Sequence, residues 1–120
     1  MLYEFEPPRL EERYCDERYL KKKYGVDIAQ GMMKFLGVLL AAENAYDIKS
    51  KPQFFMEHKK GNLSLYYSVS LDKKRSKWRL LVQMLDEDGN VVIPTEDEKA
   101  FLQSIKKIRI KEISDHYAGY

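Results

Sequence analysis

The sequence is poor in the features that mark several large protein classes. It has a single cysteine, Cys15, so no internal disulfide can form and a reducing compartment fits it best. Its longest strongly apolar stretch, residues 35–42, is far shorter than the roughly 20 residues that span a bilayer. The first residues are acidic and lack the apolar segment of a secretory signal. We therefore expect a cytoplasmic protein without a membrane partner, and a Cys15 that is buried or half-buried rather than nucleophilic.

Motifs for metals and nucleotides are also missing. The chain has no glycine-rich phosphate loop, no G-x-S-x-G turn and no H-E-x-x-H helix. Cys15, His58 and His116 do not have the spacing of zinc ligands. The acidic residues between 86 and 98 do not match a calcium-binding loop. We expect neither a metal site nor a cofactor.

What the chain does have is the composition of one globular domain, which we place over residues 1–120. Hydrophobic residues make up 44% and charged residues 33% of its 120 residues, enough to bury a core. The net charge is only +2, but residues 49–79 hold nine lysines and arginines against two acids. Such a segment predicts a surface that faces a polyanion. From charge alone, a lysine-rich loop that only keeps the protein in solution is an equally good interpretation.

The N-terminal part of the sequence predicts one strand and two helices. Residues 2–6 form a short strand that the Pro7-Pro8 pair ends. Residues 9–24 form a helix, with Leu10, Tyr14, Leu20 and Tyr24 at helical spacing and Gly25 as its stop.

The second helix begins at Asp27, which has Gln30 in capping-box position, and ends near residues 45–48. Its apolar stripe consists of Ile28, Met32, Phe35, Leu36, Leu39 and Leu40. The short connection predicts that the two helices form a helical hairpin.

The pattern then changes to strands. Residues 62–71 alternate apolar residues with Ser and Tyr, which is typical of a half-buried strand, and the more apolar residues 78–85 predict a central strand. A turn at 88–90, a helix over 96–107 with Thr95 and Glu98 as a capping box, and a strand over 109–114 follow. The expected fold is α+β, with helices on one face of a small, mainly antiparallel sheet. We expect the other face to present serine and tyrosine side chains to a ligand.

Three short stretches carry a family resemblance. Glu57 precedes the run Lys60-Gly61-Asn62-Leu63-Ser64, Arg79 lies between Trp78 and Leu80, and a His116-Tyr117 pair follows the last expected strand. In this order they resemble the RelE/ParE superfamily of bacterial toxins, and most of all its YoeB branch of ribosome-dependent messenger-RNA endonucleases. The relatives often carry basic residues where this chain has Ser68 and Ser70, and the helix near 96–107 looks like an insertion.

The resemblance implies a RelE-like fold and a set of roles. Glu57 would take the proton of the RNA 2′-hydroxyl, Arg79 would bind the phosphate, and His116 would protonate the leaving oxygen. An unperturbed histidine pKa of about 6.5 suits proton donation near neutrality. Tyr117 would stack on a base or hold the phosphate. The products would be a 2′,3′-cyclic phosphate and a 5′-hydroxyl.

Further residues and partners follow from the same resemblance. The expected contacts to the RNA backbone come from Lys59, Lys60, Lys73, Lys74, Arg75 and Lys77. The implied partners are a cognate antitoxin protein, the ribosome and messenger RNA, and the sequence leaves a homo-oligomer open. Two alternatives also stay open: a ParE-like toxin that inhibits DNA gyrase without nuclease activity, and a non-catalytic RNA-binding or protein-binding module. Taken singly, Glu57 is more typical of a surface carboxylate than of a catalytic one, and Arg79 is equally typical of a cross-strand ion-pair partner. His116 alone is typical of a mobile surface histidine.

Overall fold

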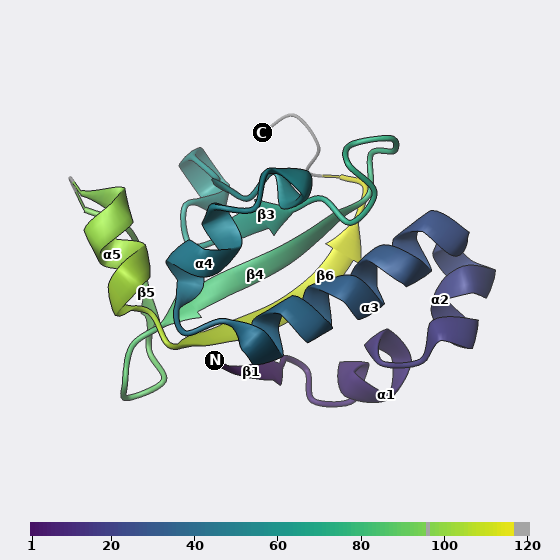
Figure 1. Cartoon of the computed structure of the whole chain (residues 1–120), viewed down its shortest axis with the longest axis horizontal. Coiled ribbons are helices and arrows are strands. Elements are labelled where there is room, and N and C mark those ends of the chain that lie inside the picture. Colours follow the sequence, from purple (N-terminus) through teal and green to yellow (C-terminus); the bar gives the residue numbers. More distant parts are fainter. Residues whose placement is uncertain (96, 117–120) are drawn as a thin grey trace.

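A mixed six-stranded β-sheet forms the centre of the protein (Figure 1). The computed structural model describes residues 1–95 and 97–116. The strands are β1 (Leu2–Phe5), β2 (Glu57–His58), β3 (Tyr67–Val69), β4 (Arg79–Leu85), β5 (Val91–Val92) and β6 (Lys107–Ser114). They lie in the order β1-β6-β4-β3-β2, and β5 pairs with β4. The expected α+β class is confirmed.

The sheet is mainly antiparallel, as expected, because the β1–β6 pair is the one parallel pair among the described strands. The expected central position of β4 is also confirmed, since β3 and β6 flank it. A bulge interrupts the β4–β6 register: Leu81 pairs with Glu112 but Val82 pairs with Ile110, so Lys111 is the extra residue.

The helices precede, connect and follow these strands. They are α1 (Leu10–Tyr14), α2 (Glu17–Tyr24), α3 (Val26–Ala41), α4 (Ala45–Lys49) and α5 (Glu98–Ser104), with short 3-10 turns at Pro52–Phe54 and Gly61–Leu63. α3 and α4 lie across one face of the sheet, and α5 lies beside its β5 end (Figure 1). α2 packs on α3, which it joins at Gly25, so the helical pair expected from the sequence is present.

Several local predictions for the helices are wrong. The helix expected over 9–24 breaks after Tyr14, because the Asp16 carboxylate accepts hydrogen bonds from the amides of Arg18 and Tyr19 and starts a new helix. The expected capping box of α3 does not form, since Gly25 is its N-cap residue. Leu40 is 69% exposed rather than part of the core stripe.

Further corrections concern Cys15 and the region after residue 60. Cys15 is exposed. The strand expected over 62–71 is formed only at Tyr67–Val69, because a 3-10 turn occupies Gly61–Leu63. α5 takes Asp97 rather than Thr95 as its N-cap, and it ends at Ser104.

The two faces of the sheet differ in what covers them. Leu80, Val82 and Met84 point into the main core under the helices, together with the isoleucines of β6. The alternate residues of β4, which are Arg79, Leu81, Gln83 and Leu85, therefore point to the opposite side, here called the second face. Ser68 lies on the second face too, but it is only 1% exposed. The expectation of an open row of serine side chains is therefore wrong at this position.

The lengths and compositions of the helices can be compared with those of membrane-spanning helices. In the described part of the chain, none is both long enough and apolar enough to cross a bilayer.

Candidate functional site

The strand register brings Glu57 and Arg79 to the same face of the sheet. Glu57 pairs with Ser68, Ser68 pairs with Leu81, and Arg79 lies two residues before Leu81 on β4. Because side chains alternate along strands, all four residues belong to the second face. With strands about 4.8 Å apart, the Cα atoms of Glu57 and Arg79 are separated by roughly 12 Å. Two long side chains bridge such a distance when both hold one phosphate group.

Glu57 lies in a basic environment. The Lys59 ammonium group is 3.0 Å from its carboxylate, and the lysine is buried while the carboxylate is half exposed. Partial burial alone would raise the pKa of Glu57, but Lys59, Lys74 and Lys49 together outweigh it and hold the pKa below its ordinary value. The carboxylate is therefore ionised at neutral pH and surrounded by cations.

Arg79 is held at the start of β4. Its Nη1 donates hydrogen bonds to the carbonyl oxygens of Ser76 at 2.7 Å and Trp78 at 2.8 Å, which fixes the guanidinium against the end of the β3–β4 loop. Trp78 packs edge-on against Tyr24, with ring centroids 4.8 Å apart, and anchors the loop to α2. Within the described residues these hydrogen bonds leave Nη2 and Nε of Arg79 for an incoming acceptor.

His116 follows the end of β6 on the Arg79 side. Ser114, the last residue of β6, pairs with Arg79, and the His116 amide donates a hydrogen bond to the Ser114 hydroxyl. The imidazole is 82% exposed, with Nε2 3.9 Å from the Asp115 carboxylate. In the strand order, Arg79 therefore lies between Glu57 and His116. Tyr117, the remaining expected site residue, lies outside the described residues.

The basic residues expected to bind RNA do not form one surface. Lys59 and Lys74 act on Glu57, and Lys60 and Lys77 are exposed. Lys73 and Arg75 line a cleft on the helix-covered side instead. The cause is local, because Lys73 and Lys74 both adopt left-handed backbone angles, with φ of 56° and 62°. The expected RNA contacts of these six residues stay a prediction, and the structure places Lys73 and Arg75 on another side of the protein than Lys59.

One cation near Glu57 was not singled out from the sequence. Lys49, at the end of α4, donates a hydrogen bond to the Met56 carbonyl at 2.7 Å and lies 3.6 Å from the Glu98 carboxylate. Glu98 also accepts a hydrogen bond from the Tyr67 hydroxyl at 3.1 Å. Lys49 belongs to the basic segment of the sequence, but nothing in its local pattern indicates that the chain returns to Glu57 eight residues later.

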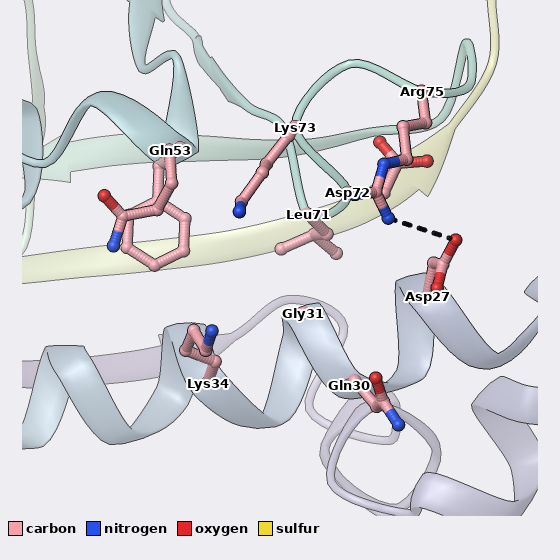
Figure 2. A pocket seen from close by; sticks show the side chains of 10 residues that line it. Asp27, Gln30, Gly31, Lys34, Gln53, Leu71, Asp72, Lys73 and Arg75 are labelled. Carbon is pink, nitrogen blue, oxygen red and sulfur yellow. Dashed lines mark ion pairs between the residues drawn. The ribbon is translucent and has the colours of Figure 1, made fainter.

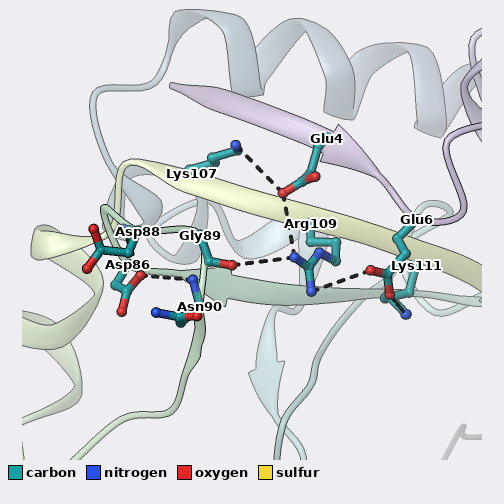
Figure 3. Close-up of polar contacts among 9 residues, drawn as sticks. All are labelled: Glu4, Glu6, Asp86, Asp88, Gly89, Asn90, Lys107, Arg109 and Lys111. Carbon is teal, nitrogen blue, oxygen red and sulfur yellow. Dashed lines mark hydrogen bonds and ion pairs between the residues drawn. The ribbon is translucent and has the colours of Figure 1, made fainter.

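The β1–β6 part of the second face neutralises its own charges (Figure 3). Arg109 lies 3.7 Å from Glu4 and 3.6 Å from Glu6, and it donates a hydrogen bond to the Gly89 carbonyl. Lys107 pairs with Glu4, and Lys111 pairs with Glu6. Basic residues here are matched by acids, whereas at β2 three lysines act on the single carboxylate of Glu57.

Comparison with known proteins identifies no relative of this chain. No protein-family model matches the chain, and neither a curated protein nor a solved structure gives a significant match. Among the described residues, no three His, Cys, Asp or Glu side chains are grouped so as to hold a metal ion.

Proposed function

We propose that this protein is a ribosome-dependent endoribonuclease with a RelE-like fold, acting as the toxin of a type II toxin–antitoxin system. The observation that carries the proposal is the register that gives Glu57 and Arg79 one face, with lysines around the carboxylate. A base beside a phosphate-binding cation is what RNA cleavage without a metal requires.

The proposed reaction uses three side chains. Glu57 accepts the proton of the 2′-hydroxyl, and the 2′-oxygen attacks the adjacent phosphorus. Arg79 binds the non-bridging phosphate oxygens, on which negative charge grows. His116 donates a proton to the departing 5′-oxygen, so that a 2′,3′-cyclic phosphate and a 5′-hydroxyl result. The attacking and leaving oxygens lie on opposite sides of the phosphorus, which agrees with Arg79 being placed between the base and the acid. Tyr117 is proposed to stack on a base.

The lysines near Glu57 link the binding of RNA to the pKa of this carboxylate. Lys74 and Lys49 lower the pKa of this carboxylate, which makes it a weaker base in the free protein. RNA phosphates that pair with these lysines offset their charge, and the pKa of Glu57 then rises. The carboxylate thus becomes a stronger base when substrate is present.

The partners belong to the same proposal. The ribosome orients the messenger RNA and completes the geometry around the exposed His116, so free RNA is a poor substrate. The cognate antitoxin covers or distorts the second face near Glu57. Action on translating ribosomes places the protein in the cytoplasm.

The test is cleavage of messenger RNA in a translating extract, with the 5′ ends of the fragments mapped. We expect Glu57→Gln and His116→Gln each to slow cleavage by at least about 100-fold, because each removes a proton-transfer group. Both side chains are substantially exposed, so circular dichroism should show intact folds. Glu57→Gln also removes the carboxylate beside the buried Lys59, so its urea unfolding should show a lower stability than that of His116→Gln. Glu87→Gln, at an exposed carboxylate in the β4–β5 turn, is the matched control.

Undiminished cleavage by Glu57→Gln would refute the proposed role of this residue. If the wild-type protein left messenger RNA intact but inhibited supercoiling by DNA gyrase, the ParE-like alternative would replace the nuclease proposal.

A further inference from the structure

A cleft opens on the helix-covered side, between α3 and the β3–β4 loop (Figure 2). Its volume is about 470 Å³, within the range of small-molecule sites. The floor is apolar and comes from the buried residues Phe54 and Leu71, while Gln30 and Gln53 add amide groups.

The walls of the cleft are fixed by a close contact. A Cβ atom at Gly31 would lie 1.7 Å from the Leu71 carbonyl oxygen, so α3 and the loop touch there with no room for a side chain. The loop is also held from within, because the Lys74 amide donates a hydrogen bond to the Ser70 hydroxyl at 2.7 Å. The left-handed backbone at Lys73 is thus maintained by its surroundings, and strain of this kind is often found at binding sites.

The two carboxylates of the cleft lie at one end, together with Arg75. Asp27 pairs with Arg75 at 3.7 Å, and Asp72 accepts a hydrogen bond from the Ser70 hydroxyl. Figure 2 shows both carboxylates at the Arg75 end, whereas Lys34 and Lys73 extend toward each other at the other end. Within residues 1–95 and 97–116, neither of these two lysines has a carboxylate partner.

We propose that this cleft binds a phosphate monoester. The phosphate group would sit between the Lys34 and Lys73 ammonium groups, whose two positive charges match its charge of about −1.5 to −2. The Gln53 amide would donate a further hydrogen bond, and the body of the ligand would rest on Phe54 and Leu71. A phosphate ion alone would fill only part of the cleft, so the fit favours an organic phosphate.

Nuclear magnetic resonance titration of the full chain tests the site. The probes are inorganic phosphate, ribose 5-phosphate and AMP, with adenosine as the uncharged control. We expect each phosphate to shift the amide signals of Gly31, Lys34, Gln53 and Lys73 in a saturable manner, with AMP or ribose 5-phosphate binding more tightly than inorganic phosphate. Adenosine should leave these signals unchanged.

Substitutions identify the residues responsible. Lys34→Gln and Lys73→Gln should each weaken phosphate binding by about tenfold, because each removes one charged contact. Lys22→Gln, at an exposed lysine on α2, is the control and should bind like the wild type. Dispersed spectra verify that every variant is folded.

The result that overturns the proposal is equally direct. Shifts that do not saturate, or that persist undiminished in both variants, mean that the cleft is no phosphate site. A trinucleotide with and without a 5′-phosphate separates the two sources of the group: tight binding of the phosphorylated form alone indicates an RNA end, and tighter binding of AMP indicates a free small molecule. The test does not involve Glu57 or cleavage, so it succeeds or fails independently of the proposed nuclease.

Discussion

At the scale of single residues, Glu57 and Lys59 form an unequal ion pair. The lysine side chain is 1% exposed and the carboxylate 48% exposed, so the ammonium group carries most of the desolvation cost. The carboxylate is the group that reports on the charge around it, since its pKa responds to three lysines. The pKa of Glu57 therefore reports on the positive charge around it on the second face.

Lys59→Met tests this electrostatic arrangement. Methionine keeps the volume of the buried chain and removes its charge, so we expect the pKa of Glu57 to rise, as measured by carboxylate carbon shifts. Lys60→Met, at the exposed neighbour, should have little effect on it. Because the folded-state pKa lies below the ordinary value of 4.5, the ionised Glu57 stabilises the fold at neutral pH, and this contribution is lost as pH falls through that pKa. Lys59→Met should therefore reduce the loss of stability that Glu57 causes on acidification; an unchanged pKa would contradict the pairing.

A second residue-scale link joins the ends of the chain. The buried Tyr14 hydroxyl accepts a hydrogen bond from the Ile113 amide at 3.0 Å, across 99 residues of sequence. Tyr14→Phe leaves that amide without its partner beside the β6 bulge. We expect the free energy of unfolding in urea to fall by about 1–3 kcal/mol.

The matched control is Tyr46→Phe. The ring of Tyr46 faces the Lys99 ammonium group at 5.2 Å, and phenylalanine keeps this contact. We expect a change of no more than about 0.5 kcal/mol. Equal decreases in the free energy of unfolding of both variants would show that the hydrogen bond to the Tyr14 hydroxyl does not stabilise the fold.

At the scale of elements, the long periodic segments were predictable and their boundaries were not. α3 and β4 follow from apolar spacing, because that spacing reflects which face is buried, and β1 and β6 were expected as short strands. The caps failed because several residues near each helix start have similar local preferences. Asp16, Gly25 and Asp97 precede the helices as N-cap residues, and the carboxylates of Asp16 and Asp97 accept hydrogen bonds from amides two or three residues further on. The alternation after Gly61 likewise predicted a strand where the chain forms a 3-10 turn.

The two glycines of α3 offer a matched pair at this scale. A side chain at Gly31 would collide with the Leu71 carbonyl, whereas a Cβ at Gly37 meets nothing within 4 Å. Gly31→Ala should therefore destabilise the protein strongly, by at least about 2–3 kcal/mol, because α3 and the loop must separate. Gly37→Ala should stabilise it by up to about 1 kcal/mol, from helix propensity alone. Urea unfolding measures both, and a tolerated Gly31→Ala would disprove the close contact.

At the scale of the whole molecule, the basic segment of the sequence divides between two sides of the protein. Charge along a sequence has one dimension, so the basic segment does not show that Lys73 and Arg75 lie on another side of the protein than Lys59. The left-handed turn at Lys73 and Lys74 sends neighbouring lysines in different directions, and local sequence gives no signal for it. The shared face of Glu57 and Arg79 was equally hidden, since it depends on a register formed across β3.

This division predicts different effects of neighbouring substitutions on RNA binding. Lys74→Gln removes a charge that acts on Glu57, so it should weaken RNA binding and reduce the salt dependence of the affinity. Lys73→Gln removes a charge on the helix-covered side and should have a clearly smaller effect. Filter binding or fluorescence anisotropy over a salt series measures both. Equal effects would mean that RNA contacts both sides of the loop.

The position of β6, between β1 and β4 in the sheet but after both in the sequence, determines when the sheet can form during synthesis. β4, the most apolar strand, pairs with β3 along one edge, and its other edge is paired only after residues 107–114 of β6 have been made. At about 5–20 residues per second, a nascent chain keeps that edge open for about one to several seconds after β4 is made. A message truncated before Lys107 therefore yields a polypeptide with an unprotected apolar edge, a template for aggregation. It also yields one without the Arg79–Ser114 pairing, so the proposed site around Arg79 and His116 forms only after residues 107–116 have been made.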